Sequence, residues 1–202
     1  GKGADPRWSD NFDAIEVCND ATFDDSENVA NDWYALLKAG RRVSAVGSSD
    51  SHSLRSDPVG YPRTCFPFGH DDTTKLTAEQ VRDAILAGTA TISGGLMLSV
   101  VGPGASLPGA ELPAGTHSFA ITVRAPSWIE AKELEVIVDG KVTKTVPLTN
   151  SGGGTGNVYA VTTDVALKAG GFVVFHARGL GDLAPVHPGR SPFAVSNPFF
   201  GE

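Results

Sequence analysis

The stretch VSAVGSSDSH, residues 43–52, predicts a short apolar strand that runs into a loop of small and polar residues. An earlier stretch, FDAIEV at residues 12–17, has the same apolar character and is followed closely by Asn19. Both stretches are short enough for strands, and each ends in side chains that can bind a ligand. Whether these two strands pair in parallel therefore decides whether the polar groups that follow them meet at one end of the sheet.

A helix is predicted between the two strands. Ser26 is a favourable N-cap residue, and Gly40 suits the left-handed position that ends many helices. The apolar residues between them recur at the spacing of one helix face: Val29, Trp33, Leu36 and Leu37. A strand, a helix and a strand in this order form a βαβ unit, whose strands are parallel. Because ligand sites lie at the carboxyl ends of parallel strands, we expect Asn19, Asp50 and His52 at one rim.

The Asp50-Ser51-His52 motif is the sharpest chemical feature. A carboxylate and an imidazole two residues apart can both bind one metal ion. The competing interpretation is a turn closed by Asp50 with a histidine on the surface. Asn19 is either a rim residue that hydrogen-bonds a ligand or part of a polar turn. The motif alone leaves these alternatives open.

Two further residues are candidates near the same rim. Arg63 follows a Gly-Tyr-Pro turn, and its planar guanidinium suits anionic oxygens, although a plain surface arginine fits the sequence equally well. Glu16 either faces an interior or is a paired surface carboxylate. The remaining histidines lack the spacing of metal ligands and are predicted to be structural or exposed: His70, His117, His176 and His187.

The second half of the chain has the pattern of an all-β domain. A helix with a Thr77 to Gln80 capping box precedes it. Beyond residue 102, short strand candidates alternate with turns, at residues 117–125, 133–138, 142–147, 159–165 and 172–177. Asp139-Gly140 between two of them predicts a tight hairpin. We therefore predict an α/β portion over residues 1–101 and a β-sandwich-like domain over residues 102–202.

Composition excludes few classes. The net charge of -7 argues against nucleic-acid binding, because phosphate contacts need a basic face. No apolar run reaches the roughly 18 residues of a membrane helix, so no membrane span is expected. Cys18 and Cys65 could pair or stay free. The first residue is Gly1, so an upstream targeting segment stays open, and both cytoplasmic and exported locations fit.

Several segments together resemble the late part of PHP-domain proteins, most closely the CehA/McbA-like metallohydrolase branch. The resemblance is carried by FDAIEVCN, LLKAG, VSAVGSSDSH and GYPRT, and beyond them by PSWIEAKELEVIVDGKVTKTVPL and SPFAVSNPFF. It implies the late βαβ portion of a distorted β/α barrel, with divalent Zn, Mn or Fe as cofactor. It also implies hydrolysis of a small-molecule phosphate ester, amide or carbamate. Asp50 and His52 match the metal ligands of the final motif, and Arg63 and Asn19 match positions near the reacting groups.

The resemblance is incomplete at the amino end. The opening His-x-His motif and the middle ligands of this family would precede residue 1, so the chain alone would lack a complete metal centre. We expect the site to be completed by a missing N-terminal portion of the same protein or by a second copy. The alternative is a non-catalytic β-sandwich module for binding or structure on a degenerate scaffold. Trp128 discriminates between them, because a binding module needs an exposed aromatic side chain and a core or interdomain tryptophan does not provide one.

Overall fold

The protein is mostly β-structure in its computed structural model, which describes residues 9, 11–53, 59–152 and 155–202. The helical elements are α1 (Glu27–Lys38), α2 (Ala78–Leu86) and the short 3-10 helices η1 (Thr73–Lys75) and η2 (Pro103–Ala105). The first strands are β1 (Ala14–Asn19), β2 (Ser44–Ser48), β3 (Arg63–Cys65), β4 (Thr91–Gly94), β5 (Met97–Val101) and β6 (Glu111–Leu112). The later strands are β7 (Gly115–Pro126), β8 (Glu130–Val138), β9 (Lys141–Pro147), β10 (Gly156–Leu167), β11 (Phe172–Leu180), β12 (Phe193–Ser196) and β13 (Phe199–Gly201).

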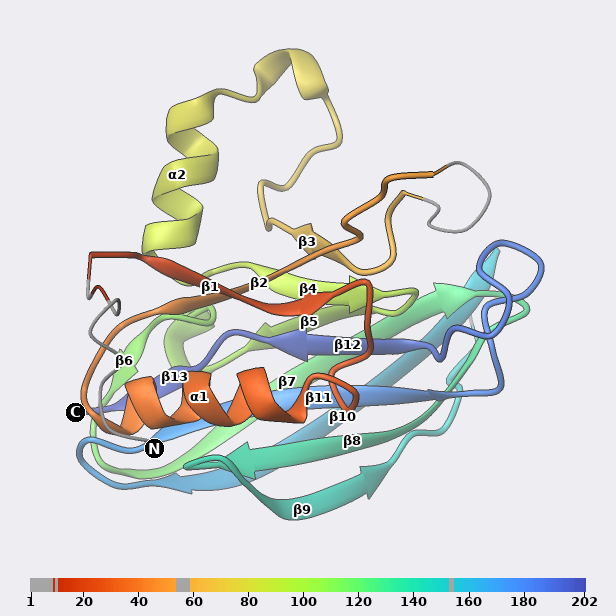
Figure 1. Ribbon diagram of the computed structural model, residues 1–202. Helices are drawn as coiled ribbons and strands as arrows, with labels where there is room; N and C mark the ends of the chain where they lie inside the picture. The colour runs from red at the N-terminus through yellow and green to blue at the C-terminus, as the bar shows by residue number, and fades with distance from the viewer. Residues whose placement is uncertain (1–8, 10, 54–58, 153–154) are drawn as a thin grey trace.

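Two sheets packed face to face make up most of the molecule (Figure 1). One contains β5, β7 and β10, and the other is centred on β11, which pairs with β8, β12 and β13. Aromatic side chains fill the space between the sheets. The ring of Phe119 on β7 lies 5.2 Å from that of Phe175 on β11 and 4.9 Å from that of Phe199 on β13. This part is compatible with the predicted β-sandwich.

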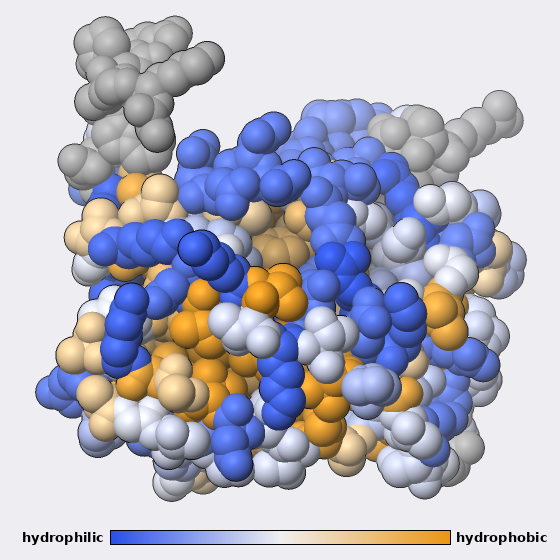
Figure 2. Space-filling view, turned by 90° about the horizontal axis from the view of Figure 1, so that it is seen from below, coloured by the Kyte–Doolittle hydropathy of each residue, from blue (hydrophilic) through white to orange (hydrophobic). Residues whose placement is uncertain are grey.

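Helix α1 covers the outer face of the second sheet. Side chains alternate along a strand, so Phe172 and His176 of β11 point away from Phe175 and toward the helix. Tyr34 of α1 stacks on Phe172 at 5.8 Å, and Phe23, just before the helix, meets His176 edge-on at 5.0 Å. Strand β11 is therefore buried on both faces. Figure 2 shows hydrophobic surface between hydrophilic side chains on the side of the molecule that carries α1, β8 and β9.

The prediction that residues 1–101 form part of an α/β barrel is wrong. Strands β1 and β2 are parallel as predicted, and Asn19 is in register with Ser48. The βαβ pattern is not continued in the described residues. Strand β4, which follows α2, is antiparallel to both β3 and β12. Helix α2 buries only Ala84 and projects away from the sheets (Figure 1), so it does not cover a parallel sheet as a barrel helix would.

Most predictions of helix caps and turns, which depend on neighbouring residues, agree better with the structure than the α/β barrel prediction does. Helix α2 has the predicted capping box between Thr77 and Gln80, and Gly40 after α1 is left-handed at φ 81°. Ser26 precedes α1, but its hydroxyl donates to the carbonyl of Thr22 and does not cap the helix. Asp139 and Gly140 both have positive φ, at 49° and 73°, as a tight hairpin requires.

The domain boundary near residue 102 stays a prediction. Buried residues from both sides of it belong to one continuous hydrophobic core, which includes Trp33 of α1, Ile92 of β4 and Phe175 of β11. Cys18 and Cys65 are both free thiols. No helix in the described ranges is long and apolar enough to cross a membrane.

Candidate functional site

The carboxyl ends of β1 and β2 meet, as the parallel pairing requires. The amide of Asp20 donates to the carbonyl of Ser48 at 3.0 Å, which extends the contact past the strand ends. Asp50 follows β2 in a left-handed conformation, at φ 44°. His52 Nε2 lies 3.2 Å from Asp50 Oδ1, and the two side chains are 77% and 51% exposed. The Asp-x-His pair is thus an open, solvent-facing group at the end of β2.

Asn19 lies at the same end but is held by its neighbours. Its Nδ2 donates to Glu16 Oε2 at 2.9 Å, and the hydroxyl of Ser48 donates to the other oxygen of Glu16. Glu16 is exposed, so the surface carboxylate is the correct one of its two interpretations. The cluster fixes the Asn19 carboxamide and leaves its oxygen without a hydrogen bond that the structure records.

Arg63 is brought to this end by β3. The hydroxyl of Thr64 accepts from the amide of Gly47 at 3.0 Å and donates to its carbonyl at 2.9 Å, so β3 lies against the last residues of β2. The Arg63 side chain is exposed and donates weakly to the carbonyl of Gly60 at 3.4 Å. It forms no ion pair with any carboxylate in the described ranges. Among the described residues, this guanidinium has no acidic partner, and it stands at the start of the strand that lies against the end of β2.

The chemistry of this pair fits part of a metal centre. Asp50 supplies oxygen and His52 nitrogen, a donor set that Zn, Mn and Fe all accept. Asp20 is not available as a third ligand, because its carboxylate accepts from Arg190 at 2.5 Å. Within the part of the chain that the structure describes, no group of three or more His, Cys, Asp or Glu residues could hold a metal ion. Further ligands would have to come from elsewhere.

One of the other histidines, His176, belongs to a charged network that the sequence did not reveal. His176 is buried, and its Nδ1 lies 3.0 Å from Glu135 Oε2. Arg178 bridges Glu135 and Asp24, with a bidentate contact to Asp24. The hydrogen bond from His176 lowers the pKa of Glu135 to about 2, against the effect of burial, and Arg178 assists. The sequence signal that could have indicated the burial of His176 is the continuous apolar run FVVF at residues 172–175, which is typical of a strand buried on both faces.

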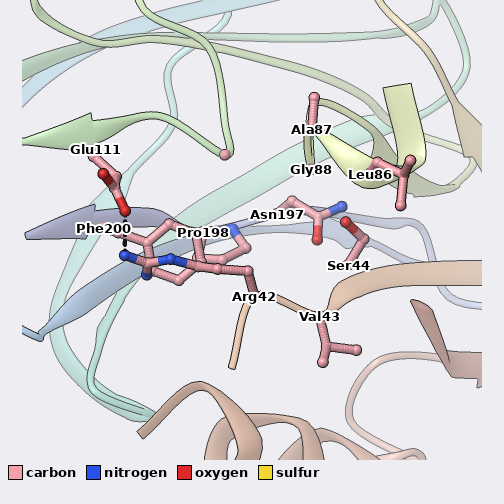
Figure 3. A pocket seen from close by; sticks show the side chains of 11 residues that line it. Arg42, Val43, Ser44, Leu86, Ala87, Gly88, Glu111, Asn197, Pro198 and Phe200 are labelled. Atoms are coloured by element: carbon pink, nitrogen blue, oxygen red, sulfur yellow. Dashed lines mark hydrogen bonds and ion pairs between the residues drawn. The ribbon is translucent and has the colours of Figure 1, made fainter. Parts of the chain in front are cut away.

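The hollow in Figure 3 lies at the opposite end of β2. It has a volume of about 190 Å³, and residues before and at the start of β2 line it, including Arg42 and Ser44. Arg42 contacts Glu111 at 2.5 Å and stacks over the Phe200 ring at 3.6 Å. Ser44 donates to the carbonyl of Ile85, and the Asn197 carboxamide bonds the backbone. Its polar groups are thus engaged in holding the scaffold together.

Comparisons with known proteins assign no family. No protein-family model matches the chain, and no curated protein matches it. The function must therefore be argued from the site itself.

Proposed function

We propose that Asp50 and His52 are two of the ligands of a divalent metal ion in a metal-dependent hydrolase. The observation that carries this proposal is the parallel pairing of β1 with β2, which brings Asn19 to the end of β2 where Asp50 and His52 follow. The exposed pair keeps lone pairs available to an ion. Zn, Mn or Fe suits a set of one carboxylate oxygen and one imidazole nitrogen.

Each side chain at this end has a role in the proposal. When bound, the metal supplies Lewis-acid polarisation of the substrate and activation of water. Asp50 and His52 hold it in place. Arg63 binds the anionic oxygens of the substrate, since it has no carboxylate partner in the described ranges. Asn19, oriented by Glu16, hydrogen-bonds the substrate through its amide oxygen, which accepts no hydrogen bond from the described residues. The substrate class is a small phosphate ester, amide or carbamate.

The remaining ligands are proposed to come from another segment of the same protein or from a second copy. Two ligands do not fix a catalytic metal, because catalytic sites generally use three or more protein donors. The open exposure of Asp50 and His52 supports this part of the proposal, since a covering segment would have room to approach them.

The test is metal content and hydrolysis in the intact natural protein. We expect Asp50→Asn and His52→Gln to lose bound Zn, Mn or Fe and at least about 100-fold in turnover of nitrophenyl phosphate or nitrophenyl carbamate. His70→Gln is the matched control, because His70 is an exposed histidine between β3 and η1 and belongs to no part of the Asp50–His52 motif. Unchanged metal content and turnover in both site variants would refute the proposal.

A further inference from the structure

A second hollow lies at the same end of the molecule as the Asp50–His52 pair. Four chain segments form it: Gly60 to Arg63 at the start of β3, Gly95 between β4 and β5, Pro126 to Ile129 from the end of β7 toward β8, and Leu183 to His187 between β11 and β12. Its volume is about 140 Å³. Figure 1 shows the β7–β8 and β11–β12 connections at the end toward which β2 runs. The hollow is thus built by segments far apart in the sequence.

The walls of this hollow are apolar and unusually exposed. Trp128 is 58% exposed and Val186 is 59% exposed, although large apolar side chains generally gain by burial. Buried Ile129 and Leu183 complete the lining. The exposed Trp128 is therefore the aromatic surface that a binding role requires, and it is not a core residue.

The hollow is held in shape by its own backbone. Asp182 accepts from the amide of Ala184 at 3.0 Å and from that of Gly189 at 2.9 Å, which closes the loop that carries Leu183 and Val186. Gly95 lies beneath this loop at φ 95°, and a methyl group there would come within 2.5 Å of a Leu183 methyl carbon. Only glycine permits this close seating. A ligand would therefore bind to a surface that already has its shape in the free protein.

The charge of the hollow is positive. Arg63 lines it, and no carboxylate does so among the described residues. Burial lowers the pKa of His187, and the positive charges of Arg63 and Arg190 lower it further, so His187 is neutral at neutral pH. Arg190 is neutralised by Asp20, whereas Arg63 has no carboxylate partner among the residues that the structure describes. Apolar walls next to the guanidinium of Arg63 suit a molecule that is apolar at one end and anionic at the other.

We propose that this hollow binds a small amphiphilic anion. Its carboxylate or phosphoryl group contacts Arg63, and its apolar body packs on Trp128, Val186 and Leu183. Because Arg63 also belongs to the proposed hydrolytic site, the hollow would receive the apolar part of that site's substrate. Binding itself requires no metal and no other ligand, so this proposal stands or falls separately from hydrolysis.

The test is tryptophan fluorescence during titration with 4-methylpentanoate, without added metal. The protein carries Trp8→Phe, so that emission comes from the exposed reporter Trp128 and the fully buried Trp33. We expect saturable binding with a dissociation constant on the order of 1 mM. Acetate, which lacks the apolar body, and 4-methylpentanol, which lacks the charge, should each bind at least about 10-fold more weakly. Equal affinities for the acid and the alcohol would contradict the role assigned to charge. The absence of a saturable fluorescence change would overturn the proposal.

Variants then assign the contacts. Arg63→Gln should weaken 4-methylpentanoate at least about 10-fold and leave the alcohol unchanged, whereas Arg63→Lys should retain part of the affinity. Arg124→Gln is the control, because Arg124 is an exposed arginine on β7 outside the hollow. Trp128→Ala should weaken binding in calorimetry, which does not depend on the reporter. Full affinity in Arg63→Gln, or an equal loss in Arg124→Gln, would contradict the assignment.

Discussion

The carboxamide of Asn197 joins β2 to the main sheet. Its Oδ1 accepts from the amide of Ala45 at 2.7 Å, and its Nδ2 donates to the carbonyls of Ala45 and Ala90 at 3.0 and 2.9 Å. The side chain thus presents a donor and an acceptor to Ala45 as a neighbouring strand would. All of this is buried, since Asn197 is 1% exposed. Asn197 thus helps to hold in place the strand that leads to Asp50, together with the pairing to β1 and the hydrogen bonds of Thr64.

Replacing Asn197 by alanine should therefore be costly. Asn197→Ala leaves two buried carbonyls and one buried amide without their partner, and we expect the free energy of unfolding to fall by about 3 kcal/mol. Urea denaturation measures this. Asn31→Ala on the exposed side of α1 is the control and should change stability by less than about 0.5 kcal/mol. A loss below about 1 kcal/mol for Asn197→Ala would show that water replaces the carboxamide.

Glu135 makes stability depend on pH in the acid range. Its pKa in the folded protein, about 2, lies below the ordinary value of 4.5, first because His176 donates a hydrogen bond to it. Its contribution is therefore complete above about pH 4.5 and is lost as the pH falls toward 2. We expect about 2 to 3 kcal/mol to disappear over this window. Glu135→Gln should flatten the curve of unfolding free energy against pH there, and parallel curves for the two proteins would contradict the assignment.

At the scale of elements, the β8–β9 hairpin shows how a turn and a helix are fitted together. Gly140 has φ 73°, and a methyl group added to it would lie 2.9 Å from the Tyr34 ring of α1. Gly170, before β11, has nearly the same φ of 72° but open space around it. Gly170→Ala should cost about 1 kcal/mol from backbone strain alone. Gly140→Ala should cost about 2 to 4 kcal/mol, because α1 must also move. If thermal or urea unfolding gave equal losses of unfolding free energy for the two variants, the Tyr34 ring would move aside without cost.

The same elements show what sequence could predict. The Asp139-Gly140 turn and the Thr77–Gln80 capping box depend on neighbours within a few residues, and both are present. The antiparallel pairing of β4 with β12 depends on Phe193 to Ser196, far along the chain, and no local signal reports it. The sequence of residues 89–101 predicts only extended structure, and which strand it pairs with depends on residues far along the chain.

The candidate site was predictable to the same extent. The end of β2 that carries Asp50 and His52 followed from the βαβ unit, because parallel pairing alone sets which ends meet. The hollow beside Arg63 did not, since Trp128 and Val186 come from two later loops. Sequence places residues on elements, whereas the convergence of loops from different sheets is decided by the packing of the whole core.

At the scale of the whole molecule, the continuous core makes a prediction about folding. Trp33 of α1 lies before residue 102 and Phe175 of β11 lies after it, yet both belong to one buried cluster. Small units with one core generally unfold in a single cooperative transition. With Trp8 and Trp128 replaced by phenylalanine, emission reports Trp33 alone. Its urea transition should coincide with that of the far-UV circular dichroism, which is dominated by the later strands.

A substitution in the core before residue 102 tests this prediction further. Ile92→Ala on β4 should lower the free energy of unfolding by about 2 to 5 kcal/mol and shift both transitions together, because β4 pairs with β12 in the sheet that contains β11. Met97→Ala on β5, where Met97 is 46% exposed, is the control and should shift neither transition appreciably. If Ile92→Ala moved the Trp33 transition alone, the two sides of residue 102 would be separate folding units. The end of the strands that carries Asp50, His52 and the Trp128 hollow would then be an interface between domains, and ligand binding there would couple their stabilities.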